Sequence, residues 1–124
     1  MIGVVADDIT GAHDIGSMFA KSGALVYVFS YSEALKEQAI TQWELPDVLI
    51  LDTDSRFDLP KVAYDKVFKA TKMLQKLGCQ QFYKKTCSAF RGNIGPELDA
   101  MLDALGEDFA GVVVGFPKNG RQTI

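Results

Sequence analysis

Two carboxylates and a hydroxyl lie close together near the start of the chain, in Asp7-Asp8-Ile9-Thr10-Gly11. Gly11 permits a tight turn, and the free backbone N–H groups at the start of a helix can meet an anion. Such a segment can hold a molecule that carries several hydroxyl groups. It can equally be the cap of a helix that begins near residue 14, through Asp8 or Thr10. Taken alone, the segment leaves a polyol site and a helix cap as alternatives.

A single arginine, Arg56, follows Asp54-Ser55. Its planar guanidinium can offer two parallel N–H donors to the carboxylate of a ligand. The same residue can instead be an ordinary exposed arginine that pairs with Asp58. The short motif leaves both roles open.

The most basic segment spans residues 84–93 and contains Lys84, Lys85 and Arg91, with the hydroxyl of Ser88 between them. Three cations and several hydrogen-bond donors in one loop favour a small anionic ligand. The alternative is a solvated basic loop that balances the dipole of a neighbouring helix.

A fourth polar segment, Asn119-Gly120-Arg121, comes later in the sequence. Gly120 frees the backbone, and Arg121 offers another guanidinium fork. Tripeptides of this kind are common in ordinary turns. This segment therefore supports a site only together with the other three.

Short apolar runs alternate with longer amphipathic stretches, which is the pattern of repeated βα units around a parallel sheet. The predicted strands are nearly all apolar, as expected when helices cover both faces. The strands span Ile2–Ala6, Leu25–Ser30, Val48–Leu51, Gln81–Tyr83 and Gly111–Val114. The helices span Asp14–Ser22, Ser32–Ala39, Pro60–Leu77 and a segment from Pro96 to Gly106 that should bury Leu98, Met101, Leu102 and Leu105. We predict an α/β fold with a mostly parallel five-stranded sheet and helices on both faces, a Rossmann-like three-layer arrangement.

Each polar segment follows the carboxyl end of a predicted strand. Residues 7–12 follow the first strand, 52–56 the third, 84–93 the fourth and 117–121 the fifth. In open α/β sheets, ligands bind in the crevice beyond these ends. The pattern predicts that the four segments converge on one site.

The composition is that of a globular protein. The 124 residues fit one α/β domain over 1–124, and 48% of them are hydrophobic. The N-terminus shows no basic region followed by a cleavage site, which favours a cytoplasmic protein, and no apolar run is long enough to cross a bilayer. A net charge of -3 provides no global field for nucleic acid.

The chain has two cysteines, Cys79 and Cys87, which form neither a CxxC pair nor a disulfide framework. The lone His13 cannot complete a metal cluster with them. We therefore expect no bound metal. Whether the chain forms a homo-oligomer is left open by the sequence.

Taken together and in order, the four segments resemble the N-terminal domain of the four-carbon acid sugar kinase family. The family pattern is ADDxTGAxD, then DSR, then KKxDSTxRGNIGxE, then PxNGR. The resemblance runs from Ala6 to Arg121 and includes Asp14, Gly95 and Glu97. It implies that this chain holds the acid sugar and that a separate C-terminal domain, absent from the chain, supplies most of the site for ATP and Mg.

The activity implied by the resemblance is ATP-dependent phosphorylation of a terminal hydroxyl of threonate, erythronate or an oxo-tetronate. Asp8 would orient, and help to deprotonate, the accepting hydroxyl, while Asp7, Thr10 and Asp14 support its loop. The residues expected to hold the substrate are Arg56, Lys84 or Lys85, Ser88 and Arg91, with Asn119 and Arg121 lining the side that faces the nucleotide domain. The chain alone should be inactive.

The sequence departs from the family pattern at two places. Cys87-Ser88-Ala89 stands where the family has DST, so a carboxylate and a hydroxyl are missing from the most basic segment. His13 stands where the family commonly has Asn. The first departure bears directly on which substrate binds.

Three other interpretations compete with a kinase. A non-catalytic module that binds or senses acid sugars fits the altered DST segment. A receiver domain would use Asp7, Asp8 and Asp52 as its acidic residues, but it gives no role to Arg56 or Arg91. A dinucleotide-binding domain is disfavoured because no GxGxxG follows the first strand.

Overall fold

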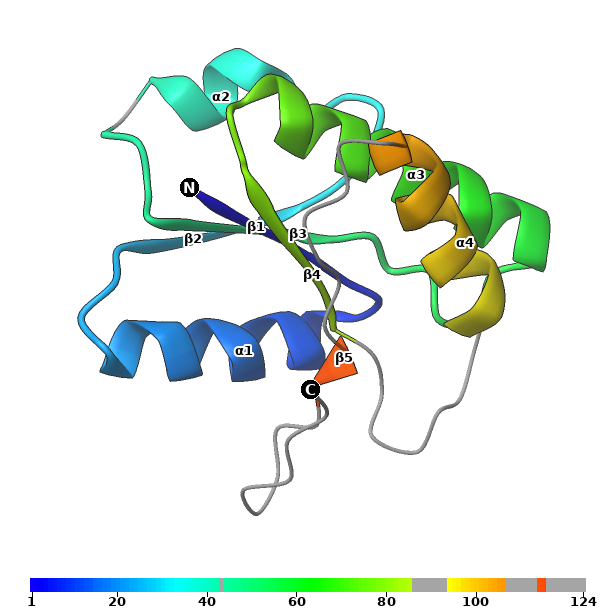
Figure 1. The fold of residues 1–124 in the computed structure, drawn as a ribbon, viewed down its shortest axis with the longest axis horizontal. Coiled ribbons are helices and arrows are strands. Elements are labelled where there is room, and N and C mark those ends of the chain that lie inside the picture. The colour runs from blue at the N-terminus through cyan, green and yellow to red at the C-terminus, as the bar shows by residue number, and fades with distance from the viewer. Residues whose placement is uncertain (43, 86–93, 107–113, 116–124) are drawn as a thin grey trace.

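The computed structural model describes residues 1–42, 44–85, 94–106 and 114–115. Strands and helices alternate along this part of the chain (Figure 1). In chain order the elements are β1 (Ile2–Ala6), α1 (Ile9–Lys21), β2 (Val26–Ser30), α2 (Glu37–Thr41), β3 (Val48–Asp52), α3 (Pro60–Lys76), β4 (Gln81–Lys85), α4 (Ile94–Leu105) and β5 (Val114–Gly115).

The strands lie in the order β2-β3-β1-β4-β5, and all neighbouring strands are parallel. β1 lies between β3 and β4, and Ala6 at its end pairs with Asp52 and with Lys85. The predicted α/β class with parallel βα repeats is therefore confirmed. The strands β1 to β4 have five residues each, whereas β5 is described only as two residues. The fifth strand was predicted at Gly111–Val114, and the described strand β5 shares only Val114 with that range.

Helices cover both faces of the sheet, with α1 on one face and α2, α3 and α4 on the other (Figure 1). Side chains alternate between the faces of a strand, so an apolar strand feeds two cores. On the α1 side, Val4 and Ile50 pack with Ala12. On the opposite side, Val5 and Leu51 pack with residues of α3 and α4. This double burial explains why the strands are nearly all apolar.

The order of the strands places a topological switch point at the end of β1. The chain leaves β1 for the edge strand β2 and then returns past β1 to β4. Right-handed crossovers then place the first helix on one face and the later helices on the other. The carboxyl ends of β1 and β4 therefore open between helices on opposite faces, where α/β sheets bind ligands.

Three helix starts differ from the sequence predictions. α1 begins at Ile9 instead of Asp14, because Asp8 has an extended backbone and accepts a hydrogen bond from Gly11 N at 2.7 Å. α2 begins later than predicted and is only five residues long. α4 begins two residues before Pro96, while the limits of α3 agree with the prediction to within one residue.

The face that α4 buries also differs from the prediction. Met101 and Leu105 are buried as expected, but Leu102 is 43% exposed and Glu97 is buried in its place. Glu97, Met101 and Leu105 are four residues apart and so lie on one helical stripe. A carboxylate therefore enters the core on that stripe. Within the described residues, no helix is both long and apolar enough to span a membrane.

Candidate functional site

The carboxyl ends of β1, β3 and β4 bring two of the four predicted polar segments together with Lys84 and Lys85, the described residues of a third. Backbone hydrogen bonds join them directly: Asp7 N donates to Lys85 O at 3.4 Å, and Ser55 N donates to Asp7 O at 3.0 Å. Thr53 N donates to Ala6 O at 2.9 Å. The segments that follow β1 and β3 are therefore held side by side at the end of β4.

An ion pair joins the first two segments. The Asp8 carboxylate accepts a bond from Gly11 N through Oδ1 and a bond from Arg56 Nη1 at 2.5 Å through Oδ2. The side chains of Asp8 and Arg56 are 25% and 14% exposed, so both reach solvent from a sheltered position. The Arg56 guanidinium also lies over the Phe57 ring, 5.1 Å from its centre. Asp58, the alternative partner of Arg56, forms an ion pair with Lys66 at 2.6 Å.

Asp7 is almost completely buried behind this pair. Removal from water raises the pKa of its carboxyl; the Lys84 ammonium opposes this shift, while the charges of Glu97 and Asp8 add to it. A carboxylate in this position belongs to the base of the site. The Asp7 carboxyl therefore interacts mainly with the charged groups around the loop, because bulk solvent hardly reaches it.

A fully buried ion pair lies beneath the loops. Lys84 Nζ lies 2.8 Å from Glu97 Oε1 and donates to Lys85 O at 3.2 Å. The other carboxylate oxygen, Glu97 Oε2, accepts a hydrogen bond from Ser55 Oγ at 2.7 Å. The sequence predicts Lys84 and Lys85 in the loop that follows the fourth strand. In the structure they are instead the last two residues of β4. In the sequence Glu97 stands out only as a motif residue, although its position four residues before Met101 was a usable signal of burial on the same helical stripe.

Lys85 lies on the opposite side of β4 from Lys84, next to the start of α1. A Cβ atom placed on Gly11 would lie 3.5 Å from Lys85 Nζ and 3.0 Å from Asp8 Oδ1. Gly11 thus allows the lysine and the Asp8 carboxylate to approach the helix N-terminus closely. Of the two lysines, Lys85 is the one beside the Asp8 loop.

The remaining predicted residues fall into two groups. Thr10 and Asp14 are exposed on α1. Ser88, Arg91, Asn119 and Arg121 lie outside the described residues, as do Cys87 and Ala89. The structure therefore brings Asp7, Asp8, Arg56, Lys84 and Lys85 together, while the roles assigned to these and to the other residues remain predictions.

Asp52, the residue that a receiver domain would phosphorylate, ends β3 and is 5% exposed. Its Oδ1 accepts a hydrogen bond from Asp54 N at 2.9 Å, which fixes a turn in which Asp54 has a φ of 47°. Burial raises the pKa of the Asp52 carboxyl, and its bond from the Asp54 backbone opposes the shift. Asp52 thus serves the turn that leads to Arg56.

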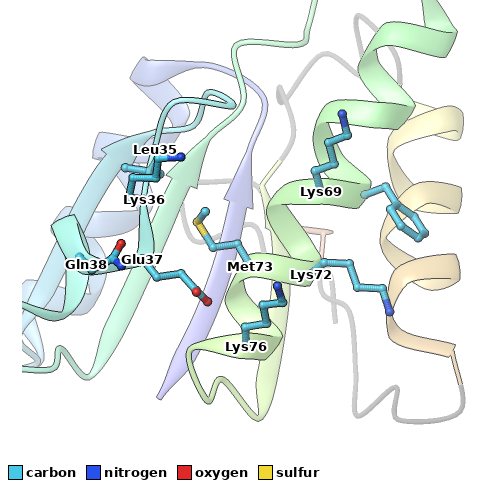
Figure 2. Close-up of a pocket in the computed structure, with 9 residues that line it drawn as sticks. Leu35, Lys36, Glu37, Gln38, Lys69, Lys72, Met73 and Lys76 are labelled. Carbon is cyan, nitrogen blue, oxygen red and sulfur yellow. The ribbon is translucent and has the colours of Figure 1, made fainter.

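A second polar region lies away from the strand ends. A hollow of about 320 Å³ lies between α2 and α3, and Figure 2 shows lysine side chains among the residues that line it. It is lined in part by Lys36, Lys69, Lys72 and Met73. It shares no residue with the group around Asp8. Among the described residues, no cluster of His, Cys, Asp or Glu is arranged to hold a metal ion.

Comparison with known proteins gives this site its context. Residues 2–124 match the family described as the sugar-binding N-terminal domain. The chain is a sugar-binding N-terminal domain of the four-carbon acid sugar kinase family. The resemblance carried by the four sequence segments is therefore confirmed.

The relatives of this sugar-binding domain are kinases of four-carbon acid sugars. The 3-oxo-tetronate kinase of Actinobacillus succinogenes is 38% identical over 128 residues, covering 98% of this chain and 29% of the relative. The D-erythronate kinase of Heliobacterium modesticaldum is 38% identical over 122 residues, covering 98% of this chain and 27% of the relative. The chain thus spans less than a third of the length of these relatives.

Solved structures agree with the fold. A domain of unknown function from Bordetella bronchiseptica, crystallised with bound citrate as a domain-swapped dimer, is 34% identical and superposes with a TM-score of 0.75. The match covers 86% of the sugar-binding domain and 26% of that chain. A Haemophilus influenzae protein, also 34% identical, gives a TM-score of 0.73 over 83% of the sugar-binding domain and 25% of that chain.

Proposed function

We propose that this domain is the acceptor half of a cytoplasmic two-domain kinase that phosphorylates a terminal hydroxyl of a four-carbon acid sugar. The acceptor is threonate, erythronate or an oxo-tetronate. The observation that carries the proposal is the Asp8–Arg56 pair at the end of β1, in a chain 38% identical to 3-oxo-tetronate and D-erythronate kinases. A carboxylate and a guanidinium side by side suit a ligand that carries a hydroxyl and a carboxylate.

Asp8 is the residue proposed to act on the accepting hydroxyl. Its carboxylate offers about four acceptor positions, and the bonds from Gly11 and Arg56 occupy two. A substrate hydroxyl can donate to a third, and the proton that leaves the hydroxyl can then pass to that oxygen of Asp8. The two existing bonds fix the direction of the carboxylate.

Arg56 is proposed to bind the substrate carboxylate. Its guanidinium presents five N–H donors in a planar fork, which matches the two oxygens of a carboxylate. The Asp8 contact and the Phe57 ring hold the fork in place. Arg56 can therefore bind the carboxylate of a small acid sugar while Asp8, on the neighbouring loop, binds its accepting hydroxyl.

The other residues have supporting roles in this proposal. Lys85, itself only 4% exposed, adds positive charge beside the Asp8 loop, whereas Lys84 has no exposed surface and pairs with Glu97. Asp7, Thr10 and Asp14 support the loop and the start of α1. The family pattern assigns Ser88 and Arg91 to the substrate, and Asn119 and Arg121 to the side that faces the nucleotide domain.

Nucleotide phosphates do not fit the start of α1 in this domain. The Asp8 carboxylate already occupies that positive helix end, where a phosphate would meet a like charge. We therefore assign Mg-ATP, which supplies the phosphoryl group, mainly to a C-terminal domain outside this sequence. The domain-swapped dimer of the Bordetella relative supports a homo-oligomer for the complete protein.

Calorimetry with erythronate, threonate and 3-oxo-tetronate tests the proposal. We expect the parent chain to bind at least one of them and Arg91→Ala to lose about 2 to 5 kcal/mol of binding free energy, since a charge-assisted pair is removed. Lys61→Ala removes one positive charge from an exposed position on α3 and should bind like the parent. Tetronate binding that is indifferent to Arg91 would contradict the proposal.

The absence of an Asp and a Thr around Ser88 keeps a non-catalytic sugar-acid module as the second candidate. Sugar-acid binding without ATP-dependent turnover in a protein that contains this domain and a nucleotide domain would favour that module. Turnover by the 124-residue chain alone would contradict the two-domain proposal. Phosphorylation of Asp52 by acetyl phosphate and magnesium, detected as a mass shift, would instead favour a receiver domain.

A further inference from the structure

A continuous set of buried polar contacts runs beneath the candidate site. It begins at Lys84 on β4 and passes to Glu97 on α4, then to Ser55 and Thr53 after β3. Thr53 Oγ1 lies 2.7 Å from Ser55 Oγ and 3.1 Å from Ala6 O at the end of β1. Because Ser55 gives its own proton to Glu97, the single Thr53 hydroxyl proton serves these two contacts. The network therefore connects four elements that are distant in the sequence.

The Glu97 carboxylate is held from both sides. One oxygen meets the Lys84 ammonium and the other accepts a bond from Ser55. Lys84, Glu97, Ser55 and Thr53 are each at most 1% exposed, so water offers no substitute partner. A buried charged group that loses its partner is strongly disfavoured, which ties each member to one arrangement.

Ser55 transmits this arrangement to the ion pair above it. It directly precedes Arg56, and its backbone N–H donates to the carbonyl of Asp7, which directly precedes Asp8. Its hydroxyl is anchored on Glu97. One residue thus fixes the backbone next to both partners of the Asp8–Arg56 pair.

We infer that Lys84, Glu97 and Ser55 are positioning residues that set the relative placement of Asp8 and Arg56. The inference rests on the proposed function, because that pair is the proposed grip on the acid sugar. It changes the role of Lys84, whose ammonium holds Glu97 in place and does not contact the substrate. The acid sugar then meets the Asp8 carboxylate and the Arg56 guanidinium at a spacing that the buried Lys84–Glu97–Ser55 network determines.

Ser55→Ala tests the inference because it removes the hydrogen bond from Ser55 to Glu97 and leaves the Lys84–Glu97 ion pair in place. Thr71→Val is the matched control, since it removes another buried hydroxyl, which donates to Val67 O at 2.7 Å within α3. We expect Ser55→Ala to weaken binding of the tetronate that the parent binds by about tenfold or more. Thr71→Val should change that affinity by less than about twofold. Circular dichroism should show both variants folded.

A second measurement needs no ligand. A double-mutant cycle with Asp8→Asn and Arg56→Gln, read from unfolding equilibria, gives the coupling between the two side chains. We expect a coupling factor of about threefold or more in the parent, falling towards one when Ser55→Ala is also present. The same cycle with Thr71→Val should retain the parent coupling.

The outcomes separate the two proposals. Coupling that is unchanged by Ser55→Ala overturns the positioning role, and so does tetronate binding that Ser55→Ala leaves intact. A parent chain that binds no tetronate overturns the proposed function. In that case the coupling cycle alone decides whether the network positions Asp8 and Arg56.

Discussion

The same two side-chain types, lysine and glutamate, form ion pairs in opposite surroundings in this domain. Lys84 and Glu97 meet at 2.8 Å with 0% and 1% of their side chains exposed. Lys69 and Glu33 meet at 2.6 Å with 53% and 79% exposed. The distances are nearly equal, so the difference between the pairs lies in what surrounds them.

The buried pair is stable only because its surroundings complete it. Two desolvated charges need further hydrogen bonds, which Ser55 and the Lys85 carbonyl provide. Lys69 of the exposed pair lines the lysine-rich hollow (Figure 2), and both groups of that pair have water as an alternative partner. The role of a lysine in a basic segment therefore depends on its burial: the buried Lys84 is the one proposed to position a site, and Lys69 lies on a solvated face.

The largest effect should come from breaking the buried pair. Glu97→Ala leaves Lys84 buried without its ion-pair partner and removes the acceptor of Ser55. We expect it to lower the free energy of unfolding by about 3 to 5 kcal/mol. Urea unfolding followed by circular dichroism measures this, with Glu33→Ala as the matched control that makes the same change in the exposed pair. A loss from Glu97→Ala no greater than that from Glu33→Ala would contradict the comparison.

A smaller effect is expected when both buried charges are replaced together. The double variant Lys84→Met/Glu97→Leu removes the desolvation cost of the two ions and keeps the volume filled. We expect its free energy of unfolding to lie within about 1 kcal/mol of the parent value or above it. The same urea experiment decides the matter. A double variant as unstable as Glu97→Ala would show that packing at this position, and not charge, dominates.

Much of the fold could be predicted from the sequence because the strands are buried on both faces. Apolar runs such as Val48–Leu51 fit a parallel sheet, and the sheet order then brings Asp8 and Arg56 to one edge. The start of α1 was predicted five residues too late, at Asp14, although Asp8 was already one of the two candidate caps. A carboxylate three residues before Gly11 was already a recognisable N-cap.

The buried network could not be predicted in the same way. A lysine at the end of a strand in a basic segment favours a ligand site, and only the docking of α4 shows that Glu97 reaches Lys84. The prediction of Leu102 as a core residue failed for the same reason, since the buried stripe of α4 begins at Glu97. The assignments of Ser88, Arg91, Asn119 and Arg121 remain predictions.

Asp7, beside the buried pair, should make stability depend on pH. Burial raises the pKa of its carboxyl above the ordinary value of 3.8, so the folded state holds the proton more tightly than the unfolded state. The stability that comes from this tighter proton binding is fully present below pH 3.8, and it is lost as the pH rises through the higher pKa of Asp7 in the folded state. Relative to Asp7→Asn, the parent should therefore lose free energy of unfolding as the pH rises above about 4. A parent that instead gains stability over Asp7→Asn with rising pH would contradict the assigned shift.

The smallest effect is expected at the exposed pair. The hydrogen bond between Glu33 and Lys69 lowers the pKa of Glu33 and raises that of Lys69, but both groups are open to solvent and to screening by salt. Glu33→Ala should leave the midpoint of urea unfolding nearly unchanged at low salt, and any difference from the parent should shrink further as salt is added. The Glu97→Ala difference should persist at the same salt concentration, because a buried charge is screened much less. Equal salt sensitivity of the two variants would mean that solvent reaches both pairs, and the contrast between them would be lost.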